Sequence, residues 1–398
     1  MRNLIFTSLF VFSVIVLTSC YPTKQSIHRT VPRKVGIDLQ HLLSVDPIIH
    51  AAIDNGEIPG AVLAVVRRGS LVYLKAYGNK SIYPTIEPMS ENTVFDLASV
   101  SKPVGTAISI MQLVENGKLL LTDPVSKYIP GFLPWTDPQT NQRVEIRIIN
   151  LLTHTSGLPS YITASLLTEK YGSPNPKALI DSIATCKRQF RPATGVLYSC
   201  LNYITLQNVL QNITGQPLCD YAKEHIFDVL GMKHTMYNPT GVTLALTAPT
   251  EKLADGSVLL GKVHDPLARL LNDGNSGNAG VFSNAEDLAL LSAALMNGGA
   301  YKGKRILSPL TVQTMMRVPE GLESFERNLG WGIHTGSLFD PDRSYSHSGY
   351  TGTSIFIDPV SQTAVILLTH RVHPEDKGNI SRLRALVLNV VASAIVKK

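Results

Sequence analysis

The chain has 398 residues, of which 44% are hydrophobic and 17% charged, and its formal net charge is +6. This composition excludes an intrinsically disordered chain, and four cysteines are too few for a disulfide-built scaffold. The 36 lysines and arginines are scattered without a run or stripe, so the sequence predicts no nucleic-acid partner.

The first twenty residues have the pattern of an export signal. Arg2 precedes an apolar run over residues 4–17, which is shorter than the roughly 20 residues that cross a bilayer. The run ends in Leu-Thr-Ser-Cys20, which resembles the bacterial lipobox, whose cysteine is acylated and becomes the first residue of the mature protein. We predict a lipoprotein signal peptide over residues 1–19, a lipid anchor on Cys20 and a tether over residues 20–36. This locates the protein in the bacterial cell envelope, facing the periplasm or the outside; an ordinary signal peptide with a chance cysteine is the alternative.

Three cysteines remain after the signal, namely Cys186, Cys200 and Cys219. One pair could form a disulfide in an oxidising compartment, which would leave one thiol over. There is no Cys-x-x-Cys motif or Cys/His cluster, so the sequence predicts no metal site and no cofactor. The adjacent His264 and Asp265 are expected to have a structural role.

Both ends of the mature chain are predicted to combine helix and strands. Apolar residues have helical spacing over residues 38–55, and apolar segments on either side of a turn predict a β-hairpin over residues 60–77. A second hairpin is predicted over residues 353–369, and a final helix over residues 381–396. Helical patterns and turn-rich loops dominate the middle, about residues 98–306.

This order predicts an α+β fold, an α/β sandwich in which one antiparallel sheet is built from both ends of the chain and is flanked by the terminal helices. The predicted sheet domain comprises residues 37–95 and 307–398. A mostly helical domain, residues 96–306, is inserted between them. Active sites favour such seams between domains.

The first candidate site is Ser99-Val-Ser-Lys102, the only place in the chain where a lysine follows a serine at the third position. An apolar helix is predicted after it over residues 104–114, with Pro103 in its first turn. Residues three apart on a helix are neighbours, so the Lys102 amine can reach the Ser99 hydroxyl. A serine needs a base to act as a nucleophile, and lysine serves if burial and neighbouring charge pull its pKa from about 10.4 toward 7. A chance match to this short motif is the alternative.

The second candidate is Tyr198, which follows a turn over residues 192–195 and precedes an apolar-periodic helix. A tyrosine at such a junction can be a proton shuttle. It can equally be a core aromatic whose hydroxyl is satisfied by a hydrogen bond.

The third candidate is His347-Ser348-Gly349, which leads through Tyr350 into a predicted strand. Small residues there let a substrate lie along the strand edge. The backbone N–H of Tyr350 could complete an oxyanion hole with that of Ser99, and His347 would supply a polar group. A glycine-rich connection into a strand is the alternative.

Taken together, the order S-x-x-K, Y-x-x, H-x-G resembles the family of class C serine β-lactamases, penicillin-binding D-alanyl-D-alanine peptidases and family VIII esterases. The resemblance covers about residue 37 to the C-terminus. Three longer stretches carry it as well, and the second of them is highly distinctive: Phe-Asp-Leu-Ala-Ser-Val-Ser-Lys102, Leu-Leu-Thr-His-Thr-Ser-Gly-Leu-Pro159 and Gly-Asn-Ala-Gly-Val-Phe-Ser-Asn-Ala-Glu-Asp-Leu288.

The resemblance implies a β-lactamase/transpeptidase-like fold and an acyl-enzyme mechanism without a metal or organic cofactor. In that mechanism Ser99 attacks a carbonyl with Lys102 as base, and Tyr198 passes a proton to the leaving group. The N–H groups of Ser99 and Tyr350 hold the oxyanion, and water then hydrolyses the ester.

Two departures from the family pattern matter. Cys200 stands where the family usually has the asparagine of Tyr-x-Asn, so an amide that would bind the substrate is missing. His347 stands where the family often has the lysine of Lys-Thr-Gly, so a permanent cation is replaced by a group that is mostly neutral at pH 7. Both losses weaken the case for β-lactam hydrolysis and leave ester or small amide hydrolysis intact.

The sequence therefore predicts an exported serine hydrolase whose substrate is a small-molecule or peptide ester or amide. A penicillin-binding sensor or peptidoglycan-binding module with little turnover is the alternative. A Ser-His-Asp hydrolase is disfavoured because the chain has no G-x-S-x-G motif.

Overall fold

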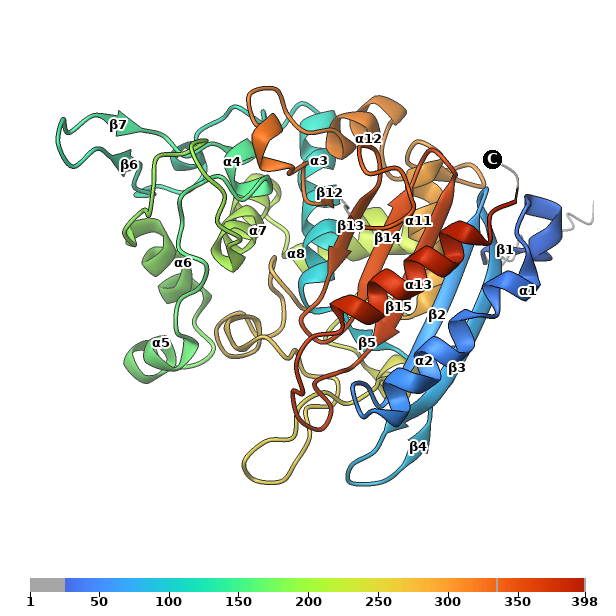
Figure 1. Ribbon diagram of the computed structural model, residues 1–398. Coiled ribbons are helices and arrows are strands. Elements are labelled where there is room, and N and C mark those ends of the chain that lie inside the picture. Colours follow the sequence, from blue (N-terminus) through green and yellow to red (C-terminus); the bar gives the residue numbers. More distant parts are fainter. Residues whose placement is uncertain (1–25, 334–335, 397–398) are drawn as a thin grey trace, which may run out of the picture.

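The computed structural model describes residues 26–333 and 336–396 (Figure 1). The predicted signal peptide, Cys20 and the first part of the predicted tether lie outside these residues. Within the described ranges, no helix combines the length and the apolar character needed to cross a membrane.

A sheet of eight strands forms the centre of the molecule. Its strands are β1 (His28–Arg29), β2 (Gly60–Arg67), β3 (Ser70–Ser81), β4 (Glu87–Pro88), β12 (Gly332–Ile333), β13 (Tyr345–Ser348), β14 (Ser354–Asp358) and β15 (Thr363–Thr369). The order is β1-β3-β2-β15-β14-β13-β12, with β4 paired to β3. β15 pairs antiparallel with β2, so both ends of the chain build one sheet, as the sequence predicts. The short edge strand β1 is the exception, because it pairs in parallel with β3.

Helices cover both faces of this sheet (Figure 1). One face carries α1 (Leu39–Leu42), α2 (Val45–Asp54) and α13 (Ser381–Ser393), whereas α11 (Ala285–Met296) packs on β2 and β15 from the other side. The predicted α+β class is confirmed. The first predicted helix is interrupted between α1 and α2, and Asp38 caps the start of α1 by accepting hydrogen bonds from two backbone N–H groups.

The strand β2 explains why the sheet is covered on both faces. Its residues are all buried, and neighbouring side chains point to opposite sides of a strand. Val62 joins the apolar cluster that contains Leu288 of α11, whereas Leu63 joins the cluster that contains Ile49 of α2 and Val387 of α13. A continuous apolar run such as this is typical of a strand buried between two layers.

Part of the segment predicted as a tether belongs to the fold. Ile27 is buried in the inner core, and the residues after it form β1. The backbone N–H of His28 also donates a hydrogen bond to the Tyr301 hydroxyl. The rest of this segment is polar, so its sequence did not indicate that one buried isoleucine holds it against the fold.

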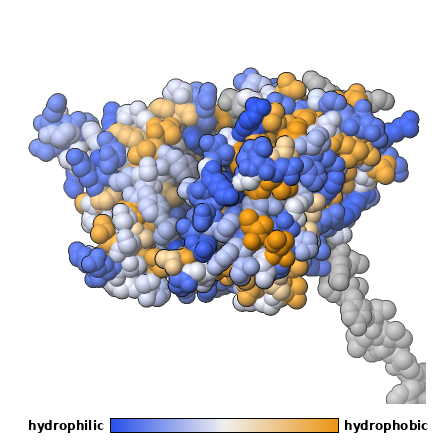
Figure 2. All heavy atoms as spheres, turned by 60° about the horizontal axis from the view of Figure 1, so that its bottom comes forward, coloured by the Kyte–Doolittle hydropathy of each residue, from blue (hydrophilic) through white to orange (hydrophobic). Residues whose placement is uncertain are grey.

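The inserted middle of the chain lies beside the sheet and is mostly helical (Figure 1). Its elements are β5 (Phe95–Asp96), α3 (Ile108–Glu115), β6 (Trp135–Thr136), β7 (Arg143–Val144), α4 (Ile148–Leu152), α5 (Ala164–Tyr171), α6 (Pro176–Thr185), α7 (Cys200–Thr214), α8 (Leu218–Ala222), α9 (Asp228–Leu230), β8 (Met236–Tyr237), α10 (Gly241–Leu246), β9 (Val281–Ser283), α11, β10 (Ala300–Tyr301) and β11 (Lys304–Arg305). The helix α12 (Pro309–Met316) follows. On the face drawn in Figure 2, hydrophilic side chains fill the middle, and hydrophobic side chains gather in smaller groups around them.

Candidate active site

The segment that carries Ser99 begins with an unusual backbone conformation. Ala98 has a φ of 46°, which is rare for a residue other than glycine and clusters at functional sites. Its N–H donates a hydrogen bond of 2.9 Å to the Asp96 carboxylate, which helps to hold the turn. Ser99 then lies in a 3₁₀ turn, Ala98–Val100, which continues as a π-helical stretch, Lys102–Ala107, into α3. The predicted helix therefore exists, but its first half is not α-helical.

The structure brings Ser99 and Lys102 together. Lys102 Nζ lies 2.9 Å from Ser99 Oγ, as the spacing predicts. It also donates to the backbone carbonyl of Asn278 at 2.9 Å and lies 3.7 Å from Cys200 Sγ. Lys102 is completely buried, so these contacts replace its hydration.

The expected lowering of the Lys102 pKa is wrong in direction. Burial favours the neutral amine and would lower the pKa, but interactions with the neighbouring Cys200 and Tyr198 side chains favour the ammonium form. The balance raises the pKa of Lys102 above its usual value. Lys102 is therefore an ammonium group in the resting protein and donates to Ser99 Oγ.

Tyr198 lies on the same side of the molecule as these residues. Lys102 Nζ is 4.9 Å from the centre of its ring, and the His347 ring is 6.3 Å away. Tyr198 is only half-buried and faces a cavity. This placement favours a role at the site over that of a core aromatic.

The third motif lies at the end of strand β13. His347 and the exposed Ser348 end the strand, and Gly349 follows against the segment that carries Ser99. A Cβ atom on Gly349 would collide with the Leu97 carbonyl oxygen and with Thr353 Oγ1. Only glycine therefore permits this close approach of the sheet to the turn that holds Ser99.

These residues line one cavity of about 550 Å³. Ser99 and Tyr198 come from the inserted domain, and residues 346–350 come from the sheet. Lys102 and Cys200 do not line this cavity, and they lie behind Ser99. The site is thus at the seam between the two predicted domains.

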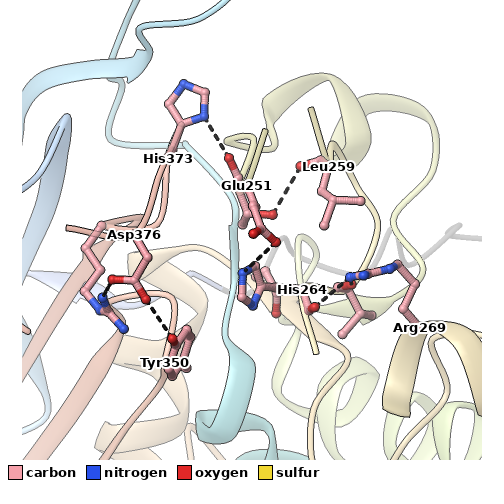
Figure 3. A network of polar contacts seen from close by, with 11 residues as sticks. Glu251, Leu259, His264, Arg269, Tyr350, His373 and Asp376 are labelled. Carbon is pink, nitrogen blue, oxygen red and sulfur yellow. Dashed lines mark hydrogen bonds and ion pairs between the residues drawn. The ribbon is translucent and has the colours of Figure 1, made fainter. Parts of the chain in front are cut away.

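Tyr350 lines the cavity, and its side chain takes part in the polar network drawn in Figure 3. Its hydroxyl donates to Asp376 at 2.7 Å, and Asp376 also pairs with Arg371. The His264 ring stacks on Tyr350 with centres 5.6 Å apart, and Glu251 lies 3.5 Å from His264. The backbone N–H of His264 donates to Asp96, which agrees with the structural role expected of it.

His347 is neutral in this environment. Burial, together with the positive charges of Lys102 and Arg327, lowers its pKa to about 3. The expectation that this position lacks a permanent cation is therefore supported. Cys186, Cys200 and Cys219 are all free thiols, so the possible disulfide between two of them does not form.

Three arginines that belong to none of the sequence motifs also line the cavity, namely Arg327, Arg371 and Arg384. Arg371 is neutralised by Asp376. Arg384 donates to the carbonyl oxygens of Gly349 and Thr353, and its Nε has no hydrogen-bond partner. Among the residues that the structure describes, neither Arg327 nor Arg384 pairs with a carboxylate. No sequence signal singled them out, because they stand in three separate segments.

Buried histidines predict that acid destabilises the protein. Burial lowers the pKa of His370 to about 3 and keeps the pKa of His154 well below 6.5. The unfolded chain therefore binds more protons than the folded protein between pH 6.5 and 3. The free energy of unfolding should therefore fall as the pH drops through this range, by up to about 1.4 kcal/mol per pH unit for each such residue. Urea titrations of His370→Phe should show a shallower fall. The exposed substitution His28→Asn is the control, and an equal slope in the His370→Phe variant and the wild type would contradict the prediction.

Comparison with known proteins gives a consistent result. The family described as Beta-lactamase matches residues 45–389. A Bacillus subtilis (strain 168) protein named "N-acetylmuramyl-L-alanine amidase" is 32% identical over 417 residues, covering 94% of each chain. An Escherichia coli (strain K12) protein named "Putative D-alanyl-D-alanine carboxypeptidase" is 30% identical over 402 residues, covering 94% of this chain and 91% of the relative. The solved structure of EstCE1, described as a hydrolase with promiscuous acyltransferase activity, superposes with a TM-score of 0.70 at 25% identity, over 89% of this chain and 99% of the other.

Proposed function

This chain belongs to the beta-lactamase family and is a serine hydrolase of that family, and from this premise we propose that it is exported and cleaves an amide or ester through an acyl-enzyme on Ser99. The contact of 2.9 Å between Ser99 Oγ and Lys102 Nζ, at the cavity between the domains, is the observation that carries the proposal.

In the proposed mechanism, Ser99 Oγ attacks the substrate carbonyl carbon, and its proton passes to the pair formed by Lys102 and Tyr198. Because Lys102 holds its proton in the resting protein, the pair must first release one proton to solvent, and the deprotonated pair then takes the proton of Ser99. Lys102 Nζ lies 2.9 Å from Ser99 Oγ and 4.9 Å from the centre of the Tyr198 ring, so the pair is within reach of that proton. The N–H groups of Ser99 and Tyr350 stabilise the oxyanion. Tyr198 then gives the proton to the leaving group, and water hydrolyses the ester to restore Ser99.

The proposed substrate carries a carboxylate close to the scissile bond, as a peptide ending in D-Ala-D-Ala does. Arg327 and Arg384 support this choice, because two guanidinium groups without carboxylate partners in the described structure face the cavity. They would take the place of the cation that is absent at His347.

A substrate panel tests the function. Purified protein is given an acylated D-Ala-D-Ala peptide, p-nitrophenyl butyrate, nitrocefin and a fluorescent penicillin. We expect repeated release of D-alanine from the peptide and turnover of the ester. Stoichiometric penicillin labelling without turnover of any substrate would instead favour the sensor or binding module.

The carboxylate assignment predicts a selective defect in Arg384→Leu. Loss of a charged hydrogen bond should raise KM for the D-Ala-D-Ala peptide by roughly 10- to 100-fold. The matched substrate is the same peptide with a C-terminal amide, because it lacks the carboxylate, and its KM should change little. An equal increase for both peptides would mean that Arg384 acts only through its bonds to Gly349 and Thr353.

The position of Cys200 predicts that an asparagine there would increase the rate of acylation by β-lactams. Its Sγ lies 3.7 Å from Lys102 Nζ, at the first residue of α7, so an amide placed there would face the reacting groups. Cys200→Asn should increase the rate of labelling by fluorescent penicillin by about tenfold, roughly the effect of one hydrogen bond. Cys200→Ser is the size-matched control, and an unchanged rate in Cys200→Asn would contradict the prediction.

The proposed location is the cell envelope, with a lipid on Cys20. Radiolabelled palmitate should be incorporated in cells that express the full chain, and Cys20→Ala should abolish the incorporation. Labelling that persists in Cys20→Ala would contradict the anchor without affecting the proposed chemistry.

A further inference from the structure

The distinctive Leu-Leu-Thr-His-Thr-Ser-Gly-Leu-Pro stretch has no part in the mechanism above, yet its histidine lies against Tyr198. His154 is 3% exposed and follows α4. Its φ of 59° is in the left-handed region, which a residue other than glycine adopts only where the surroundings impose it. A strained and buried histidine next to a reacting group requires an explanation.

His154 makes three contacts with Tyr198 and its two neighbours in the chain. The His154 carbonyl oxygen accepts a hydrogen bond of 3.0 Å from the N–H of Leu197, the residue before Tyr198. Its ring atom Nδ1 accepts one of 3.1 Å from the N–H of Ser199, the residue after Tyr198. The ring itself packs against the Tyr198 ring, with centres 4.5 Å apart. One residue therefore holds the backbone on both sides of Tyr198 and one face of its side chain.

The hydrogen bonds also define the state of the ring. A backbone N–H can only donate, so Nδ1 of His154 must be an unprotonated acceptor. Asn202 Nδ2 lies 3.1 Å from the same atom, and the Asn202 oxygen accepts from Ser156 Oγ, which leaves its amino group to donate to the ring. Burial and the nearby charge of Lys102 lower the pKa of His154 well below its usual value, which agrees with a neutral ring.

We propose that His154 is the positioning residue of Tyr198: its neutral ring and its carbonyl group fix the backbone around Tyr198, so that the hydroxyl stays within reach of Ser99 and the leaving group. The inference rests on the proposed function of Tyr198 as the proton carrier. A displacement of about 1 Å at a reacting group can lower the rate about a hundredfold. A histidine that acts in this way changes kcat rather than substrate binding.

Two substitutions of His154 distinguish the effect of its hydrogen-bond acceptor from the effect of its aromatic ring. His154→Phe keeps an aromatic ring but removes the acceptor of the Ser199 N–H. His154→Asn removes the ring, offers an amide oxygen as acceptor, and tolerates a positive φ. With p-nitrophenyl butyrate, kcat of His154→Phe should fall about a hundredfold at nearly unchanged KM, and His154→Asn should restore most of it. Full activity of folded His154→Phe would overturn the proposal.

A double-mutant cycle distinguishes this inference from the function on which it rests. In the Tyr198→Phe background, His154→Phe should cause almost no further loss of kcat, because its effect passes through the Tyr198 hydroxyl. Additive losses would overturn the inference, whereas full activity of Tyr198→Phe alone would overturn the proposed role of Tyr198. Ile49→Ala, in α2 on the far face of the sheet, is the stability control, since it should lower the melting temperature without changing kcat. Where His154→Phe does not fold, His154→Gly replaces it, because glycine accepts the positive φ while losing both ring and acceptor.

Discussion

Ser99→Ala is expected to lower kcat for p-nitrophenyl butyrate by about 10⁴-fold or more, the scale of losing a nucleophile. Ser99 Oγ lies 2.9 Å from the Lys102 ammonium group and faces the cavity, so its loss removes the atom that would form the acyl-enzyme. The fold should remain intact, because the side chain is partly exposed and alanine fits in its place. Circular dichroism and a thermal melt check the fold beside the kinetic assay.

Ser101→Ala is the matched control, two residues along the same segment. Ser101 is buried, and its Oγ accepts a hydrogen bond of 3.0 Å from the N–H of Val281. Its removal leaves that N–H without a partner and should cost about 1–3 kcal/mol of stability, while most of kcat survives. Equal activity of Ser99→Ala and the wild type, or a greater kcat loss in Ser101→Ala, would contradict the assignment of Ser99.

Lys102→Met is expected to lower kcat by roughly 10²- to 10⁴-fold, the contribution of a positioned acid–base group. Methionine fills a similar buried volume, but it cannot donate to Ser99 Oγ or stabilise a charge on Tyr198. The rate of acylation by fluorescent penicillin should fall with kcat, since both reactions need the same proton transfer. Acylation at the wild-type rate would contradict the role of Lys102.

The pH dependence of kcat/KM distinguishes a lowered pKa of Lys102 from a raised one. A base whose pKa had fallen toward 7 would give a kcat/KM that stops rising near pH 7. Because the pKa of Lys102 is raised, deprotonation of the pair formed by Lys102 and Tyr198 becomes easier only as the pH increases, and kcat/KM should still rise between pH 7 and 9. A plateau reached near pH 7 would contradict a raised pKa of Lys102 in the working enzyme.

Much of the fold was predictable because the spacing of apolar residues in the sequence matches the burial of those residues in the structure. The apolar runs of β2 and β15 identify strands buried on both faces, and their positions at opposite ends of the chain predicted one shared sheet. The edge strand β1 was not predictable, since it is two residues long and is held by one buried isoleucine within a polar segment.

The candidate site was predictable to the extent that spacing determines contact. Ser99 and Lys102 are three residues apart in a helical segment, and this local geometry fixes their distance. Tyr198 and His347 needed the family resemblance to be linked to that pair, because only the folded chain brings the three segments together.

Two properties of the site depend on the fold itself. Arg384 reaches the cavity from the last helix, and nothing in its local sequence distinguishes it from other surface arginines. The direction of the Lys102 pKa depends on how near the Cys200 and Tyr198 side chains lie, which is a result of packing rather than of spacing.

Mass spectrometry of the acylated protein tests the central claim most directly. Trypsin cleaves poorly before Pro103, so Ser99 lies in a fragment of residues 81–118. After reaction with fluorescent penicillin or a fluorophosphonate, fragmentation should locate one adduct on Ser99, and Ser99→Ala should abolish it. An adduct elsewhere in the chain that persists in Ser99→Ala, or no adduct on residues 81–118 while the enzyme turns over substrate, would contradict the account.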